Sequence, residues 1–290
     1  MNMSRYQVPT EILTIENFIN GEFVPCENHF FSINPATGEP CARVPDSDAS
    51  VIEAAVIAAK SSFYRWATTP LAERCKILLK IADLIEANAE ELATYESMDN
   101  GKPIWLSREM DIPRAIHNFR HFANTVQSDV DMASIVPECG QQPGFLNYVV
   151  HEPIGVVGVI TPWNLPLYLL TFKLAPALAY GNVVVAKPSE LTSMTAYKLC
   201  HILNEAGVPP GVVNMVFGYG QKVGEALVDH KYVPLISFTG GTKTGTQIAE
   251  RSARYVKKLS LEVSQQRIRL QRSATTFEVL RQLDISFLLF

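Results

Sequence analysis

Five short strand-like runs in the second half of the sequence, separated by four helical patterns, constrain the fold more than any other feature. Runs rich in valine and isoleucine and bounded by Pro and Gly are typical of strands buried on both faces of a parallel sheet. The helical segments between them would supply the right-handed crossovers that parallel neighbours need. The alternation predicts an α/β fold with a doubly wound, Rossmann-like parallel sheet. The strands are expected at 154–160, 182–186, 212–217, 235–239 and 257–262, and the helices at 165–180, 190–206, 221–229 and 243–254.

The part before residue 150 is predicted to be a turn-rich β region followed by an N-terminal helical segment. Asn20-Gly21 lies between the apolar pairs 18–19 and 23–24, which indicates a hairpin. A helical period begins near Asp48, with Asp48 or Ser50 as alternative N-caps. Further helices are expected at about 71–86, 89–97 and 111–126, and a strand at 145–150.

Charge and cysteine usage argue against several classes of protein. The 290-residue chain has a net charge of −4 and no basic block, which argues against nucleic acid as a partner. No apolar leader follows Met1, and the five cysteines form no C-x-x-C motif, so we expect a reduced, cytoplasmic protein. His117 and His121 have the spacing of metal ligands, but no third ligand accompanies them. We therefore expect a solvated helix face there and no metal.

One uncharged window, residues 153–172, is long enough to span a bilayer. Pro162 and Pro166 flank the polar Asn164 near its centre. A helix broken at that point would leave backbone groups without partners in lipid. We therefore expect no membrane span.

Two loops that follow predicted strands carry polar side chains where open α/β sheets bind ligands. They are Thr161-Pro162-Trp163-Asn164 and Lys187-Pro188-Ser189-Glu190. The Lys187 ammonium and the Glu190 carboxylate can each bond the vicinal hydroxyls of a ribose. A carboxylate there would also repel a 2′-phosphate, which favours NAD over NADP. Each loop has a structural alternative, in which Asn164 or Ser189 caps the helix that follows, with Glu190 in the first turn of the second helix.

Two glycine-rich loops follow the next two strands. Gly218-Tyr219-Gly220-Gln221-Lys222-Val223-Gly224 is similar to a dinucleotide-binding fingerprint, but its third glycine is one residue late, so the signal is weak. Gly240-Gly241 precedes a helix whose N-terminal amides can bind an anion. No Lys-Ser or Lys-Thr pair follows Gly245, which argues against a P-loop and phosphoryl transfer.

These motifs occur in a recognisable order: Thr-Pro-Trp-Asn, Lys-Pro-Ser-Glu, Gly-Val-Pro-Pro-Gly-Val-Val-Asn, Phe-Thr-Gly and Leu-Ser-Leu-Glu. Their order and spacing resemble the aldehyde dehydrogenase superfamily over about residues 15–262. The apolar helix after Asn164 is most similar to the branch that acts on 2-aminomuconic and hydroxymuconic semialdehydes. The resemblance implies a domain at 15–262 that binds NAD, and a parent enzyme that oxidises a small-molecule aldehyde to a carboxylic acid.

The resemblance also implies roles for individual residues. Asn164 would form part of an oxyanion hole, and Glu262 would be the general base that activates water. Residues 145–152 are similar to the family's oligomerisation strand, which implies a homo-oligomer or pairing with full-length subunits. The residues that would contact the cofactor are Ile160, Thr161, Pro162, Trp163, Lys187, Ser189, Glu190, Gly220, Gly240 and Gly241.

The sequence departs from the family pattern in two places. Gly241 stands where the family usually has Ser, which removes a hydroxyl near the phosphates. After Glu262 the family continues with Leu-Gly-Gly and reaches a nucleophilic cysteine, whereas here no cysteine follows Cys200. We therefore expect residues 263–290 to be a non-homologous tail, the catalytic domain to be missing and the chain to be inactive. The alternative role is a non-enzymatic partner of full-length subunits.

Overall fold

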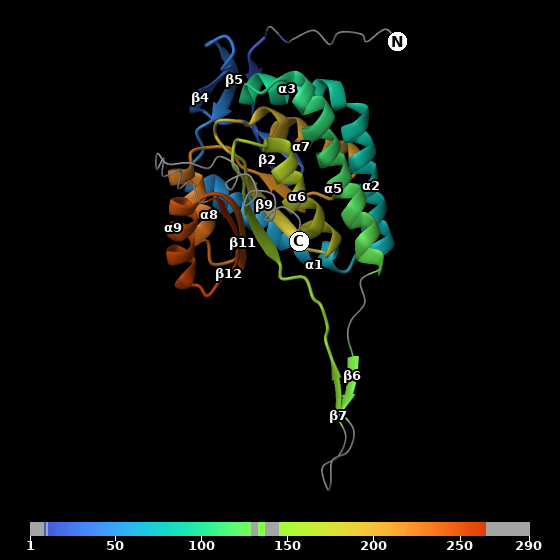
Figure 1. The fold of residues 1–290 in the computed structure, drawn as a ribbon. Helices are drawn as coiled ribbons and strands as arrows, with labels where there is room; N and C mark the ends of the chain where they lie inside the picture. Colours follow the sequence, from blue (N-terminus) through green and yellow to red (C-terminus); the bar gives the residue numbers. More distant parts are fainter. Residues whose placement is uncertain (1–8, 10, 129–132, 137–144, 265–290) are drawn as a thin grey trace, which may run out of the picture.

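The five predicted strands pair into one parallel sheet in the computed structural model, which describes residues 9, 11–128, 133–136 and 145–264. The sheet order begins β12-β11-β8-β9-β10 (Figure 1). The chain therefore runs from β8 towards β10 on one side and to β11 and β12 on the other. This reversal makes a topological switch point between β8 and β11. The strands are β8 (Val156–Ile160), β9 (Val183–Lys187), β10 (Val213–Met215), β11 (Leu235–Gly241) and β12 (Lys258–Ser264).

The predicted hairpin extends this sheet beyond β10. Strand β2 (Asn17–Ile19) pairs antiparallel with β10, and β3 (Glu22–Val24) pairs antiparallel with β2. Asn20 and Gly21 both have positive φ, at 55° and 81°. A two-residue turn with this conformation matches the twist of the flanking strands, so the Asn-Gly pair was a reliable signal.

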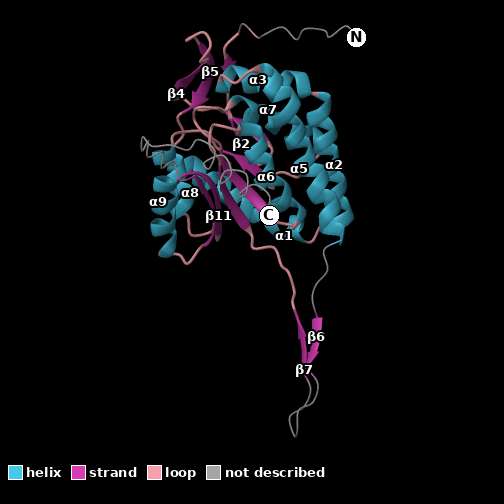
Figure 2. Ribbon diagram, in the orientation of Figure 1, coloured by secondary structure: helices cyan, strands magenta, loops and turns pink. Residues whose placement is uncertain are grey.

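Helices cover both faces of the sheet (Figure 2). On one face lie α1 (Ala49–Ala67), α8 (Glu225–Asp229) and α9 (Thr242–Ala253). On the other lie α6 (Pro166–Ala179) and α7 (Met194–Ala206), which are covered in turn by α2 (Leu71–Ala87), α3 (Ala89–Asn100) and α5 (Ile112–Thr125). Strand β9 is completely buried between these layers, which explains why its sequence is a continuous apolar run.

Two predicted helices begin differently from expectation. The helix expected at 190–206 begins at Met194, because residues 188–193 form a loop. The helix expected at 221–229 is a π-helical turn, Gly220–Gly224, followed by the short α8. Helix α1 begins as predicted: Asp48 is its N-cap and accepts from the amide of Ser50 at 2.9 Å.

The remaining elements are small. Strands β1 (Leu13–Thr14), β5 (Pro40–Pro45) and β4 (His29–Ile33) form a three-stranded sheet in that order. Short helical turns, Ile104–Leu106, Ser107–Asp111 and Val126–Ser128, flank α5. Strands β6 (Ala133–Val136) and β7 (Phe145–Tyr148) form a two-stranded antiparallel ribbon that projects from the body (Figure 1). The predicted strand at 145–150 is therefore two residues shorter than expected.

The predicted boundary at Glu262 falls inside β12. This strand continues through Val263 and Ser264, which pair with Gly240 and Gly241. The rest of the predicted tail, 265–290, lies outside the described residues. Within the described part of the chain, no helix has both the length and the apolar character needed to cross a membrane.

Candidate functional site

A groove of about 550 Å³ lies at the carboxyl ends of β8, β9 and β11, at the switch point of the sheet. This is where open α/β sheets place ligands. Its walls come from the loops after four strands and from one side of α9. All of the residues predicted to contact a cofactor line it: Ile160, Thr161, Pro162, Trp163, Lys187, Ser189, Glu190, Gly220, Gly240 and Gly241.

The loop after β8 forms one wall of the groove. The Thr161 amide donates to the Lys187 carbonyl at 3.3 Å, so the loop continues the β8–β9 pairing for one residue before it turns. The Thr161 hydroxyl is buried and, among the described residues, is one of the polar atoms without a hydrogen-bond partner. Trp163 lines the groove and is 55% exposed.

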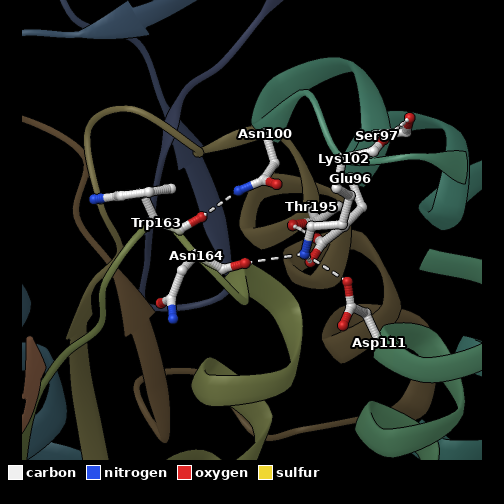
Figure 3. A network of polar contacts seen from close by, with 8 residues as sticks. All are labelled: Glu96, Ser97, Asn100, Lys102, Asp111, Trp163, Asn164 and Thr195. Atoms are coloured by element: carbon white, nitrogen blue, oxygen red, sulfur yellow. Dashed lines mark hydrogen bonds and ion pairs between the residues drawn. The ribbon is translucent and has the colours of Figure 1, made fainter. Parts of the chain in front are cut away.

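Asn164 belongs to this loop but does not line the groove. Helix α6 begins at Pro166, and no side chain caps it. The alternative in which Asn164 caps the helix is therefore wrong. Its side chain is exposed, and its main-chain carbonyl accepts from Lys102 Nζ at 3.1 Å (Figure 3).

Lys187 and Glu190 form an ion pair in the groove. Lys187 is the last residue of β9 and is only 4% exposed, and its Nζ lies 2.5 Å from Glu190 Oε2. Burial lowers the pKa of the Lys187 ammonium, and the Glu190 carboxylate opposes that shift. Burial raises the pKa of Glu190, but the charge and hydrogen bond of Lys187 bring it below its usual value. The pair thus places a donor and an acceptor side by side, which is what vicinal hydroxyls require.

Ser189 is not a helix cap. Its hydroxyl accepts from the amide of Leu191 at 3.2 Å within the loop. The amide of Met194, at the start of α7, instead donates to Asp99 Oδ2 at 2.8 Å. A carboxylate from α3 thus caps α7, and the loop that carries Lys187, Ser189 and Glu190 is left to line the groove.

The glycines lie where the chain is most closely packed or where a helix begins. A Cβ on Gly240 would lie 2.5 Å from the ring of Phe238, so a larger residue would displace that ring. Gly241 precedes α9, whose N-terminus therefore borders the groove. Helix N-termini favour anions such as phosphate. Gly220 lies beside Lys187: a Cβ there would be 4.0 Å from its Nζ.

Glu262 lies on β12, next to the groove rather than in its lining. It is exposed and accepts from the hydroxyl of Thr239, its partner on β11, at 2.8 Å. Lys173 of α6 is buried and donates to the hydroxyl of Ser237 at 3.1 Å. Burial lowers the pKa of Lys173, and the nearby charge of Glu262 opposes that shift.

The sequence interpretation missed about half of the lining. Four of these residues, Thr244, Gln247, Ile248 and Arg251, lie at positions i, i+3, i+4 and i+7 of α9 and so share one face. Helical spacing after the glycine pair was a signal that could have identified them. Four more, Gln221, Gly224, Glu225 and Val228, have the same spacing after Gly220 in a segment predicted to be helical, so they carried the same signal. The remaining three, Tyr219, Phe238 and Thr239, carried no such signal.

In the part of the chain that the structure describes, no group of three or more His, Cys, Asp or Glu side chains could hold a metal ion. His117 and His121 stack on each other, with ring centroids 5.5 Å apart.

Known proteins with similar sequences and structures share this architecture. The family model described as the aldehyde dehydrogenase family matches residues 23–267. The chain is 53% identical over 254 residues to a 2-aminomuconic semialdehyde dehydrogenase of Bos taurus, a match that covers 87% of this chain and 51% of the relative. It is 41% identical over 249 residues to a 5-carboxymethyl-2-hydroxymuconate semialdehyde dehydrogenase of Escherichia coli, covering 86% and 52%.

Solved structures give the same result. The NAD+ complex of an aldehyde dehydrogenase from Bacillus cereus superposes with a TM-score of 0.81 at 40% identity, covering 87% of this chain and 51% of that one. HpcC from Thermus thermophilus superposes with a TM-score of 0.82 at 42% identity, covering 87% and 48%. The chain thus spans about half the length of the relatives it matches. On sequence and structure together, the chain belongs to the aldehyde dehydrogenase family.

Proposed function

We propose that this chain binds NAD in the groove at the β8–β11 switch point. The observation that carries the proposal is the ion pair between the buried Lys187 and the half-buried Glu190, set in the same groove as the start of α9. The pair suits the hydroxyls of the adenine ribose, and the helix N-terminus with Gly240 and Gly241 suits the pyrophosphate. Ile160 to Trp163 would border the nicotinamide end. A relative in this family has been solved with NAD+ bound, which supports the assignment.

Calorimetric titration of the chain with NAD tests the proposal. We expect saturable binding at one site, and about tenfold weaker binding for Lys187→Met, because a charge-assisted hydrogen bond to the ribose is lost. Lys76→Met is the control, since Lys76 pairs with Glu73 on the exposed surface of α2. Absence of binding, or equal affinity for Lys187→Met and the unchanged chain, would refute the assignment.

For the complete protein to which this fold belongs, we propose oxidation of an aldehyde, with a muconic semialdehyde as the substrate class. The names of the similar proteins support that class. When bound, NAD accepts a hydride from the substrate. Asn164 would stabilise an oxyanion through its side-chain amide, and Glu262 would take a proton from the attacking water. Both residues lie beside the groove, on the β8–α6 loop and on β12.

The resemblance places the nucleophilic cysteine after Glu262, and no cysteine follows Glu262 in the 290 residues. The last cysteine in the sequence, Cys200, is completely buried in the middle of α7, where burial raises the pKa of its thiol. A buried thiol with a raised pKa is a poor nucleophile. We therefore propose that this chain alone binds the cofactor without oxidising aldehydes.

The projecting ribbon favours a second role, in which the chain associates with copies of itself or with full-length subunits. Tyr148, Val149 and Val150 at its base are 67%, 46% and 58% exposed. Tyr148 ends β7 and the two valines follow it. Exposed apolar residues beside a projecting ribbon are suited to contact with another chain. Size-exclusion chromatography with light scattering should show an oligomer that Val149→Asp and Val150→Asp convert to monomer. A monomer at all concentrations, alone and mixed with a full-length family member, would contradict this role.

We also propose a cytoplasmic location. The four cysteines that the structure describes, Cys26, Cys41, Cys75 and Cys200, are all free, which is typical of a reducing compartment.

A further inference from the structure

A turn at the end of α3 lies against the loop that carries Asn164. Helix α3 ends at Asn100, and Gly101 follows with φ of 82°, a left-handed conformation that favours glycine. This turn lets the residues on either side of Gly101 reach the same loop. Asn100 Nδ2 donates to the Trp163 carbonyl at 2.6 Å, and Lys102 Nζ donates to the Asn164 carbonyl at 3.1 Å (Figure 3). Two successive carbonyls of the loop are thus bound by side chains from 63 and 62 residues away in the chain.

Two buried carboxylates hold the Lys102 ammonium in place. Nζ lies 2.5 Å from Asp111 Oδ2 and 3.5 Å from Glu96 Oε1, and neither acidic side chain is exposed. The other oxygen of Glu96 accepts from the hydroxyl of Thr195 at 2.8 Å. An ammonium fixed on two sides in a region of low dielectric cannot easily leave the Asn164 carbonyl, and charge-assisted hydrogen bonds there are strong.

Binding two adjacent carbonyls fixes two peptide planes, because each peptide unit is rigid. The direction of the Cα–Cβ bond of Asn164, which lies between those planes, is fixed with them. In Figure 3 the side chain of Asn164 points away from Lys102. We infer that Lys102 is a positioning residue: together with Asn100 it sets the backbone of the loop that lines the groove at Trp163 and presents the Asn164 amide. This inference rests on the proposed function, since the loop borders the proposed nicotinamide end.

The cluster could instead serve only to join α3 to α6 and α7. Disrupting the cluster of Lys102, Glu96 and Asp111 would have different effects under a structural role and under a positioning role. A purely structural role would lower the free energy of unfolding without loosening the loop more than its surroundings. A positioning role would loosen the loop selectively and weaken NAD binding even where the global fold is intact.

Two variants separate these roles. Lys102→Met combined with Glu96→Gln and Asp111→Asn removes all three charges, so that no buried charge is left unpaired. Asn100→Ala removes the other donor without altering a buried charge. Lys198→Met is the matched control, because Lys198 also pairs with a glutamate of α3, Glu91, at 2.9 Å but contacts no residue of the loop.

The measurements are NAD affinity by calorimetry and backbone hydrogen exchange by mass spectrometry on peptides covering 161–168 and 183–187. We expect the triple variant to bind NAD about tenfold more weakly and Asn100→Ala about threefold. In both variants, the backbone amides of 161–168 should exchange faster than in the unchanged chain, and those of 183–187 should exchange at the same rate as in the unchanged chain. The control should match the unchanged chain in both measurements.

The failures can be told apart. If the unchanged chain binds no NAD, the proposed function fails, and the exchange rates across 161–168 still decide whether Lys102 holds the loop. If the chain binds NAD but the triple variant has the same affinity and the same exchange across 161–168, the inference is wrong and the function stands. Equal acceleration across both peptides would show a structural role only.

Discussion

Among single residues, Glu190 is the one that we expect to select between NAD and NADP in the groove. Its carboxylate is ionised beside Lys187, and its pKa is below the usual value. An ionised carboxylate accepts hydrogen bonds from a free ribose hydroxyl and repels a 2′-phosphate. The preference for NAD that we expect therefore comes from one side chain.

We predict that Glu190→Gln lowers the ratio of NAD affinity to NADP affinity by about tenfold. The repulsion of the 2′-phosphate is lost, while the shape of the site is kept. Calorimetry with both dinucleotides measures the ratio. Glu91→Gln is the control, since Glu91 is paired with Lys198 on the surface of α3. An unchanged or larger ratio in Glu190→Gln would show that another group selects the dinucleotide.

Glu96 makes the stability of the chain depend on pH. Burial raises its pKa from 4.5 to about 7, partly opposed by the Lys102 ammonium. The pKa of Glu96 is higher in the folded chain than in the unfolded chain. Its neutral carboxyl group therefore contributes fully to stability below pH 4.5, and this contribution is lost as pH rises through 7. We predict that the free energy of unfolding of the unchanged chain falls by about 3 kcal/mol between about pH 4.5 and 8 because of Glu96. In Glu96→Gln, whose side chain stays neutral, this fall should be absent. Urea unfolding at several pH values tests this, and parallel pH profiles for variant and unchanged chain would contradict it.

At the scale of elements, the acidic face of α3 organises the helices around the groove. Asp99 accepts from the amide of Met194 at the start of α7 and from the hydroxyl of Ser32 on β4 at 2.6 Å. One carboxylate thus joins α3, α7 and the small sheet. It replaces the local cap that α7 lacks, and so fixes where that helix begins.

We predict that Asp99→Ala lowers the free energy of unfolding by about 3 kcal/mol, because two buried donors lose their acceptor. Asp99→Asn should cost about half as much, since an amide oxygen can still accept from one of them. Asp83→Ala, which removes an exposed partner of Arg120, should change stability by less than about 0.5 kcal/mol. Equal losses for Asp99→Ala and Asp83→Ala would show that α7 does not need this cap.

For the whole molecule, we propose a division between cofactor binding and chemistry, because no cysteine follows Glu262 in the 290 residues. We predict no aldehyde-dependent formation of NADH by the purified 290-residue chain, measured by absorbance at saturating NAD. Addition of a cysteine-blocking reagent should change nothing, because no cysteine takes part. Turnover above the background of heat-treated protein would contradict the prediction, whether or not it survives alkylation of the cysteines.

Local sequence patterns were enough to predict the elements and about half of the groove lining. The central parallel strands were recognisable because a strand buried on both faces is a continuous apolar run, and β9 is such a strand. Strand β12, at the edge of the sheet, contains Lys, Ser and Glu and was recognisable only from its place in the alternation. The strand ends meet at one edge of a parallel sheet, so the order of strands and helices along the chain was enough to expect Lys187, Glu190 and the Gly240 loop near one another. These inferences needed only neighbours in the chain and the geometry of the βαβ unit.

The strand order, the addition of the hairpin to the main sheet and the helix caps depend on contacts between distant parts of the chain. Asn164 and Ser189 looked like caps because local sequence offers no competitor, whereas the acceptor that caps α7 is Asp99, 95 residues away. The contacts of Lys102 with Asn164 and of Asn100 with Trp163 also join residues far apart in the chain. Such contacts form because the packed core brings their elements together, and no local periodicity records them. The side chains that hold the loop in place were therefore visible only in the folded molecule.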